Sequence, residues 1–80
     1  MLLIEIADSS LAYDRTVKRA LYARHRIPEF WIVNLKHGEV EVCRQPEGDG
    51  YASTSTKKRD AVLEPYRLLG VRIQAAELLG

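Results

Sequence analysis

The chain has 80 residues, 46% of them hydrophobic and 29% charged, and its formal net charge is +1. This length and balance predict one soluble globular domain over residues 1–80, with a single modest core. No apolar run reaches the roughly 20 residues of a membrane span, and the N-terminal LLIEIA is too short and too acidic for a signal peptide. We therefore expect a cytoplasmic protein with no membrane partner. The single cysteine, Cys43, excludes an internal disulfide and a cysteine-based zinc site.

The first predicted elements are a strand over residues 2–7 and a helix over residues 11–25. The strand is rich in Leu and Ile on both of its faces, which is typical of a central strand in a sheet. Ser9 or Ser10 can cap the helix, because a hydroxyl there accepts a hydrogen bond from a free backbone N–H group. Pro28 ends the segment, since the residue before a proline is excluded from helical geometry.

The predicted helix has one apolar face and one mixed flank at a turn of roughly 100° per residue. The apolar face comprises Tyr13, Val17, Ala20 and Leu21, with Arg15 and Arg19 pointing away from it, and the flank comprises Asp14, Lys18 and His25. Lys18 is therefore expected to reach along the edge of the helix toward the sheet.

The rest of the chain predicts a small sheet and a short closing helix. Strands are expected over residues 30–35, 39–44 and 51–56, with a loop over residues 45–50, an irregular stretch over 60–69, a strand over 71–73 and a helical turn or two over 74–79. In the second of these strands, Val40 and Val42 alternate with Glu39, Glu41 and Cys43, so the two sets lie on opposite faces. The order β-α-β-β-β, followed by a short strand and a helix, indicates an α+β (mixed α/β) domain.

Glu5 is the unusual residue of the first strand, because a carboxylate in a buried strand is costly unless it is paired or bound to a cation. Three interpretations remain open. Glu5 forms an ion pair with Lys18 or an arginine, or it lies at a wet end or edge of the strand, or it is a metal ligand. In the third case, a carboxylate beside a backbone carbonyl gives hard oxygen donors suited to Mg²⁺, and a nearby lysine could orient the attacking water of a phosphodiester hydrolysis.

Two basic clusters are compatible with DNA as a partner. The first comprises Arg15, Lys18, Arg19, Arg24 and Arg26 with His25, and the second comprises Lys57, Lys58 and Arg59. Such clusters can meet phosphates, and they are equally compatible with a solvated helix face and a charged loop.

The stretch EIADSSLAYDRTVKRALYARHRIPEFWIVNLKHGEVEVCR resembles the Uma2 family (DUF820) of the PD-(D/E)XK nuclease superfamily. The resemblance rests on a set of linked motifs. These are a glutamate-containing strand, a Ser-rich turn, Tyr-Asp-Arg, a lysine four residues after the aspartate, a Tyr-Ala pair, Ile-Pro-Glu and an aromatic-aliphatic strand. The later EPYRLLGVRIQAAELLG is similar to the closing strand and helix of the family.

The resemblance implies a restriction-endonuclease-like core and a DNA endonuclease that depends on Mg²⁺ or Mn²⁺. Glu5 matches the acid of the nuclease motif, and the backbone carbonyl of Ile6 would be the accompanying metal ligand. The superfamily usually has its lysine two residues after that acid, whereas the matching catalytic lysine here is Lys18 on the helix. Asp14 and Tyr22 match positions that hold or flank the site.

The chain departs from the family in lacking the preceding strands and the first aspartate of the motif, for which Asp8 and Asp14 are the nearest substitutes. We therefore expect a domain cut down to its C-terminal half, with the metal held weakly. Two functions follow as alternatives: a nuclease, or a non-catalytic interaction and dimerisation module. An unpaired strand edge favours a homodimer. Its expected interface comprises Leu2, Leu3, Ile4 and part of the sheet face of residues 30–35.

Overall fold

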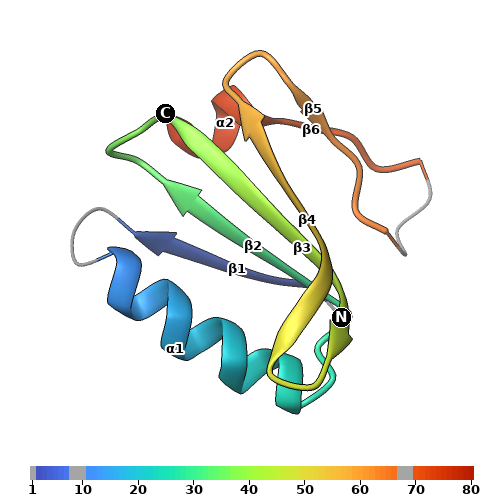
Figure 1. Cartoon of the computed structure of the whole chain (residues 1–80). Helices are drawn as coiled ribbons and strands as arrows, with labels where there is room; N and C mark the ends of the chain where they lie inside the picture. The colour runs from blue at the N-terminus through green and yellow to red at the C-terminus, as the bar shows by residue number, and fades with distance from the viewer. Residues whose placement is uncertain (1, 8–10, 67–69) are drawn as a thin grey trace.

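The computed structural model describes residues 2–7, 11–66 and 70–80, with residue 7 and residues 11–16 described by their backbone alone. Its elements are β1 (Leu2–Ala7), α1 (Leu11–Arg24), β2 (Glu29–Asn34), β3 (Glu39–Glu47), β4 (Gly50–Lys58), β5 (Val62–Leu63), β6 (Ile73–Gln74) and α2 (Ala75–Leu79). The first four strands form one mixed sheet in the order β1-β2-β3-β4, and β5 and β6 form a small hairpin (Figure 1). The expectation of a mixed α+β fold is confirmed.

The sheet combines one parallel pair with two antiparallel pairs. β1 and β2 are parallel and joined through α1, whereas β2-β3 and β3-β4 are antiparallel hairpins. The register places Glu5, Ile32, Glu41 and Thr56 side by side in one row across the four strands. Because directly paired residues share a face, these side chains all lie on the same side of the sheet.

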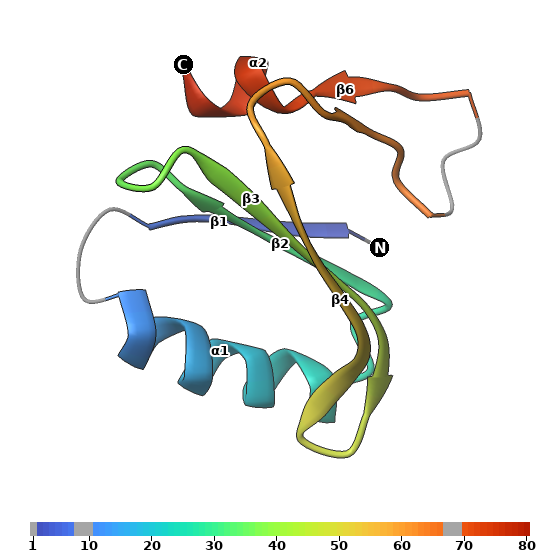
Figure 2. The same ribbon diagram turned by 45° about the horizontal axis from the view of Figure 1, so that its top comes forward.

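The molecule has three layers, with α1 on one side of the sheet and α2 with the β5-β6 hairpin on the other (Figure 2). The α1 side holds a cluster of Phe30, Ile32 and Cys43, against which Leu3, Tyr22 and Tyr51 pack. The opposite side holds a larger cluster of Trp31, Val33, Val40, Val42, Leu63 and Ala75. β2 lies between these clusters and is buried along its whole length, which explains its unbroken FWIV run.

The last turn of α1 ends in a Schellman motif. Arg26 has a positive φ of 59°, the Arg26 N–H donates to the Ala23 carbonyl at 3.0 Å, and the Ile27 N–H donates to the Tyr22 carbonyl at 3.0 Å. This reversal, followed by Pro28, directs the chain into β2. The predicted end of the helix is confirmed to within one residue.

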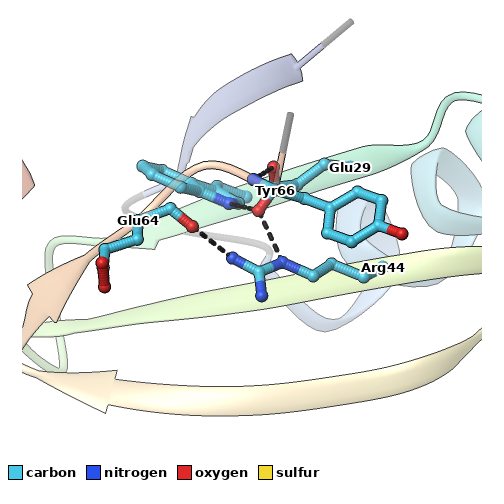
Figure 3. A network of polar contacts seen from close by, with 5 residues as sticks. Glu29, Arg44, Glu64 and Tyr66 are labelled. Carbon is cyan, nitrogen blue, oxygen red and sulfur yellow. Dashed lines mark hydrogen bonds and ion pairs between the residues drawn. The ribbon is translucent and has the colours of Figure 1, made fainter. Parts of the chain in front are cut away.

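Glu29, at the start of β2, ties the segment after β5 to the sheet (Figure 3). Its side chain is buried; Oε2 accepts from Trp31 Nε1 and Arg44 Nε, each at 2.8 Å, and Oε1 accepts from the Tyr66 N–H at 2.8 Å. Arg44 Nη2 also donates to the Glu64 carbonyl at 2.6 Å. Because a buried carboxylate is costly without its hydrogen bonds, this network holds Glu64 and Tyr66, which follow β5, against the sheet.

Three strand predictions need correction. β1 was expected to be central, but it lies at one end of the strand order of the described sheet. Residues 45–47 were expected in a loop, but they extend β3, and Gln45 accommodates this with a φ of 62°. The stretch 60–69 was expected to be irregular, but Val62–Leu63 pairs with Ile73–Gln74, where the closing strand begins two residues later than predicted.

The predicted rotation of α1 about its axis is also wrong. Val17 and Leu21, expected in the apolar face, are 47% and 41% exposed, while Ala23 is fully buried. Arg19 was expected to point away, but it pairs with Glu41 on β3. The side of α1 that faces the sheet therefore carries the ion-paired Lys18 and Arg19 together with the packed Tyr22 and Ala23. The prediction for Tyr13 concerns a side chain outside the described set.

We predict that Arg44→Met destabilises the protein by about 3–5 kcal/mol, because it leaves the Glu29 carboxylate buried without its cation. Unfolding in urea, followed by the fluorescence of the single tryptophan, Trp31, measures the loss. Arg72→Met is the matched control, since Arg72 lies in an exposed pair with Glu64 at 3.8 Å. Equal midpoints for the two variants would contradict the assigned role of Glu29.

Candidate active site

The candidate site lies between β1 and α1, on the α1 side of the sheet. Lys18 and Tyr22 are one helical turn apart, so both project from the same flank of α1 toward Glu5. Lys18 Nζ lies 3.1 Å from Glu5 Oε2, and the Tyr22 hydroxyl donates to Glu5 Oε1 at 2.7 Å. The two oxygens of one carboxylate thus receive a cation and a neutral donor from a single helix.

Tyr22 is held in place by aromatic neighbours. Its ring meets the buried Phe30 ring edge-on, with the centroids 4.9 Å apart and the planes at 75°. Tyr51 also packs near Phe30, with the two ring centroids 6.4 Å apart, and its hydroxyl donates to the Ile27 carbonyl at 2.8 Å. Burial raises the pKa of Tyr51 to about 12. Packing of the Tyr22 ring against Phe30 therefore fixes the direction in which the Tyr22 hydroxyl reaches Glu5.

The electrostatics of the site favour an ionised Glu5 and a protonated Tyr22. The hydrogen bond from Tyr22 lowers the pKa of Glu5, and the contact with Lys18 adds to this against the opposing effect of burial. The same hydrogen bond, together with burial, raises the pKa of Tyr22. At neutral pH the site therefore presents a carboxylate, and the Glu5 side chain is 28% exposed.

A second ion pair lies two strands away in the same row. Arg19, the residue after Lys18, pairs with Glu41 on β3, and Cys43 Sγ lies 3.9 Å from Glu41 Oε1. Ile32 occupies the row between Glu5 and Glu41. Lys18 and Arg19, which are consecutive in α1, thus pair with acids on the two strands that flank β2. Sequence reasoning missed this second pair, although the spacing of Glu41 from the valines already placed it on the face opposite Val40 and Val42.

The remaining predicted site residues are less closely connected. Ile6 lies in β1, and its backbone is adjacent to Glu5, but its side chain is on the opposite face and is 67% exposed. Asp14 lies in α1, one turn before Lys18, with its side chain outside the described set. Asp8 lies outside the described residues. Of the predicted site residues, the structure brings Glu5, Lys18 and Tyr22 together.

Glu5 and the main-chain carbonyl of Ile6 are the residues of this site that could contribute oxygen ligands to a divalent cation. A carboxylate and an adjacent main-chain carbonyl are hard oxygen ligands of the kind that Mg²⁺ prefers. Within residues 2–7, 11–66 and 70–80, no three His, Cys, Asp or Glu side chains gather closely enough to form a metal site. Glu5 would therefore leave most of the coordination shell to water or to groups from elsewhere.

Residues 1–76 match the model of the Uma2 family, which is described as "Putative restriction endonuclease". The chain belongs to the Uma2 family. No curated protein and no solved structure matches it. The match includes the Glu5–Lys18–Tyr22 cluster within a Uma2 domain and confirms the resemblance seen in the sequence. None of the helices in the described part of the chain could span a membrane.

We predict that Tyr22→Phe raises the pKa of Glu5, because the main hydrogen bond that favours the charged carboxylate is lost. Carboxyl ¹³C NMR titration measures the pKa directly. Lys18→Met should also raise the pKa of Glu5, because it removes both a hydrogen bond and a coulombic attraction that favour the charged carboxylate.

The same pKa shift has a consequence for stability. The pKa of Glu5 in the folded protein lies below the ordinary value of 4.5, so its stabilising contribution is present above about pH 4.5 and is lost as the pH falls through the folded pKa. A Tyr22→Phe protein with an unchanged Glu5 pKa would contradict the assigned hydrogen bond.

Proposed function

We propose that this Uma2 domain contributes the acid and the lysine of a divalent-metal-dependent DNA endonuclease site, on a restriction-endonuclease-like core. The observation that supports this is the contact of Glu5 with both Lys18 and Tyr22, at the positions that the family resemblance marks. Hydrolysis of a phosphodiester needs an activated water and a cationic environment for the negative charge that develops on the phosphate. The cluster supplies a carboxylate and a cation side by side.

Each residue has a separate task in this proposal. Glu5 and the Ile6 carbonyl would hold Mg²⁺ or Mn²⁺, which when bound lowers the pKa of a coordinated water and offsets charge on the phosphate. Lys18 orients the attacking water or contacts the scissile phosphate through its ammonium group. Tyr22 fixes the carboxylate by its hydrogen bond to Oε1. Further metal ligands must come from outside the described residues or from a second chain.

We predict slow nicking of supercoiled plasmid DNA at most, because the described part of the site has one carboxylate, Glu5, and so lacks much of the usual charge stabilisation. Any nicking should require Mg²⁺ or Mn²⁺ and disappear in Glu5→Ala and in Lys18→Ala. Arg72→Ala is the control, since Arg72 lies outside the two basic clusters, in an exposed pair with Glu64 at 3.8 Å. Gel electrophoresis of plasmid forms measures the reaction, and circular dichroism confirms that each variant folds.

Two results of this assay would argue against the proposed site. Nicking that survives both substitutions would place the chemistry elsewhere, and nicking that proceeds equally in a chelator would remove the metal from the reaction. A folded wild-type chain that never cleaves would favour the second candidate function.

The second candidate is a self-association module, supported by the position of β1. This strand lies at one end of the described sheet, and its Ile4 and Ile6 side chains are 39% and 67% exposed on the α2 side. An apolar strand at a sheet edge is a template for pairing with another chain. Residues 30–35, also expected in the interface, lie mostly in β2, which is buried within the chain, with Leu35 exposed beyond its end. The proposed interface is therefore centred on β1.

We predict a homodimer through β1 that Ile6→Lys weakens, because the substitution places a charge on the exposed apolar face of the edge strand. Light scattering at micromolar concentration should report about twice the mass of one chain for the wild type, and mostly single chains for the variant. Val62→Lys is the matched control, since Val62 is similarly exposed but lies in β5. A monomeric wild-type protein would rule out this function.

A further inference from the structure

We propose that Lys18 acts as a placeholder cation, occupying Glu5 in the metal-free protein and leaving Oε2 when a divalent cation binds. This inference rests on the proposed metal role of Glu5 and adds to it a way in which the site is controlled. The observation behind it is that Lys18 Nζ lies 3.1 Å from Glu5 Oε2, so an ammonium already stands at the oxygen that a metal would use.

Electrostatics favour an exchange over simultaneous occupation. An ammonium and a divalent cation on the same carboxylate oxygen would repel each other at a separation of a few ångströms, where the interaction of charges is strong even in a well-solvated site. The Lys18 side chain is 41% exposed, so its flexible stem has solvent on one side into which the ammonium can move. Binding of the cation therefore includes the cost of opening the Lys18–Glu5 pair.

Tyr22 behaves differently from Lys18 at the same carboxylate. Its hydroxyl is a neutral donor on the other oxygen, Oε1, at 2.7 Å, and its ring is held against the buried Phe30. A neutral donor does not repel a cation, and an ionised carboxylate oxygen can accept more than one interaction. Tyr22 therefore keeps Glu5 oriented while Lys18 moves.

The exchange couples metal binding to the position of the lysine. In the metal-free state the Lys18 ammonium is engaged by Glu5. After the exchange it stays on the same flank of α1, close enough to the occupied site to contact a water or a phosphate oxygen. The lysine thus lowers the affinity for the cation and becomes available for chemistry only when the cation is present.

The test is the affinity for Mn²⁺, measured by electron paramagnetic resonance of the free ion, for the whole 80-residue chain and four variants. We expect Lys18→Met to bind Mn²⁺ about tenfold more tightly than wild type, because the competing charge is gone. Arg24→Met, which removes the same charge from an exposed position of α1, should change the affinity by less than about twofold. Tyr22→Phe should not tighten binding, and Glu5→Gln should abolish it.

The variants separate failure of this inference from failure of the proposed function. Binding that is unchanged in Glu5→Gln would remove Glu5 as a ligand and overturn both. Binding that is lost in Glu5→Gln, yet equal or weaker in Lys18→Met, would keep the metal site and overturn the exchange. Lys18→Gln, a neutral polar substitution, provides the same comparison if Lys18→Met does not fold.

A second readout on the unmodified protein needs no substitution. The ¹⁵N signal of the Lys18 ammonium should shift as Mg²⁺ is added, with the same midpoint as the signal of the Glu5 carboxyl carbon. A Lys18 signal that stays constant while Glu5 saturates would contradict the exchange.

Discussion

The Glu5 carboxylate is the constraint on which the arrangement of β1 and α1 depends. A charge on the helix-facing side of a strand must be satisfied by whatever packs over it, and α1 supplies both a cation and a hydroxyl from one flank. Arg19, the neighbour of Lys18, forms the corresponding pair with Glu41 on β3. The two pairs lie on the side of the helix that also packs Tyr22 and Ala23 against the sheet, and the apolar Val17 and Leu21 are partly exposed.

Glu29 and Glu5, two acids of the sheet, differ in burial, and this difference distinguishes a structural role from a chemical one. Glu29 is buried on the α2 side, and its oxygens accept from a ring N–H, a guanidinium and a backbone N–H, so its site is closed. Glu5 has two partners and remains partly exposed to solvent. A closed carboxylate site stabilises the fold. An open one beside a cation can exchange partners, which is the property that the proposed metal site requires.

Much of the fold follows from local patterns in the sequence. The end of α1, the β2-β3 hairpin and the facing of Val40 and Val42 follow from Pro28 and strict alternation, which act over a few residues. The helix cap expected at Ser9 or Ser10 lies outside the described residues. The pairing of Glu5 with Lys18 could also be predicted, because a buried charge demands a partner and Lys18 lies on the nearest flank. The place of Tyr22 at the site was predicted from the family resemblance and not from a local pattern.

Other features of the fold depend on contacts between segments that are distant in the sequence, so no local sequence pattern predicts them. The β5-β6 hairpin pairs two short segments about ten residues apart, and the Glu29 network that supports it joins three separate parts of the chain. The facing of α1 could not be predicted from its apolar stripe, because the decisive partners, Glu5 and Glu41, lie on different strands. The position of β1 at the end of the described sheet likewise depends on strand order rather than on its own apolar composition.

The central claim is that a divalent cation binds to this domain through Glu5. The most direct measurement is a Mg²⁺ titration of the wild-type protein, followed by the carboxyl ¹³C signals of its 11 aspartates and glutamates. The account predicts that the Glu5 signal shifts most and saturates with a single midpoint. A Glu5 signal that does not move, while other carboxylates saturate, would contradict it.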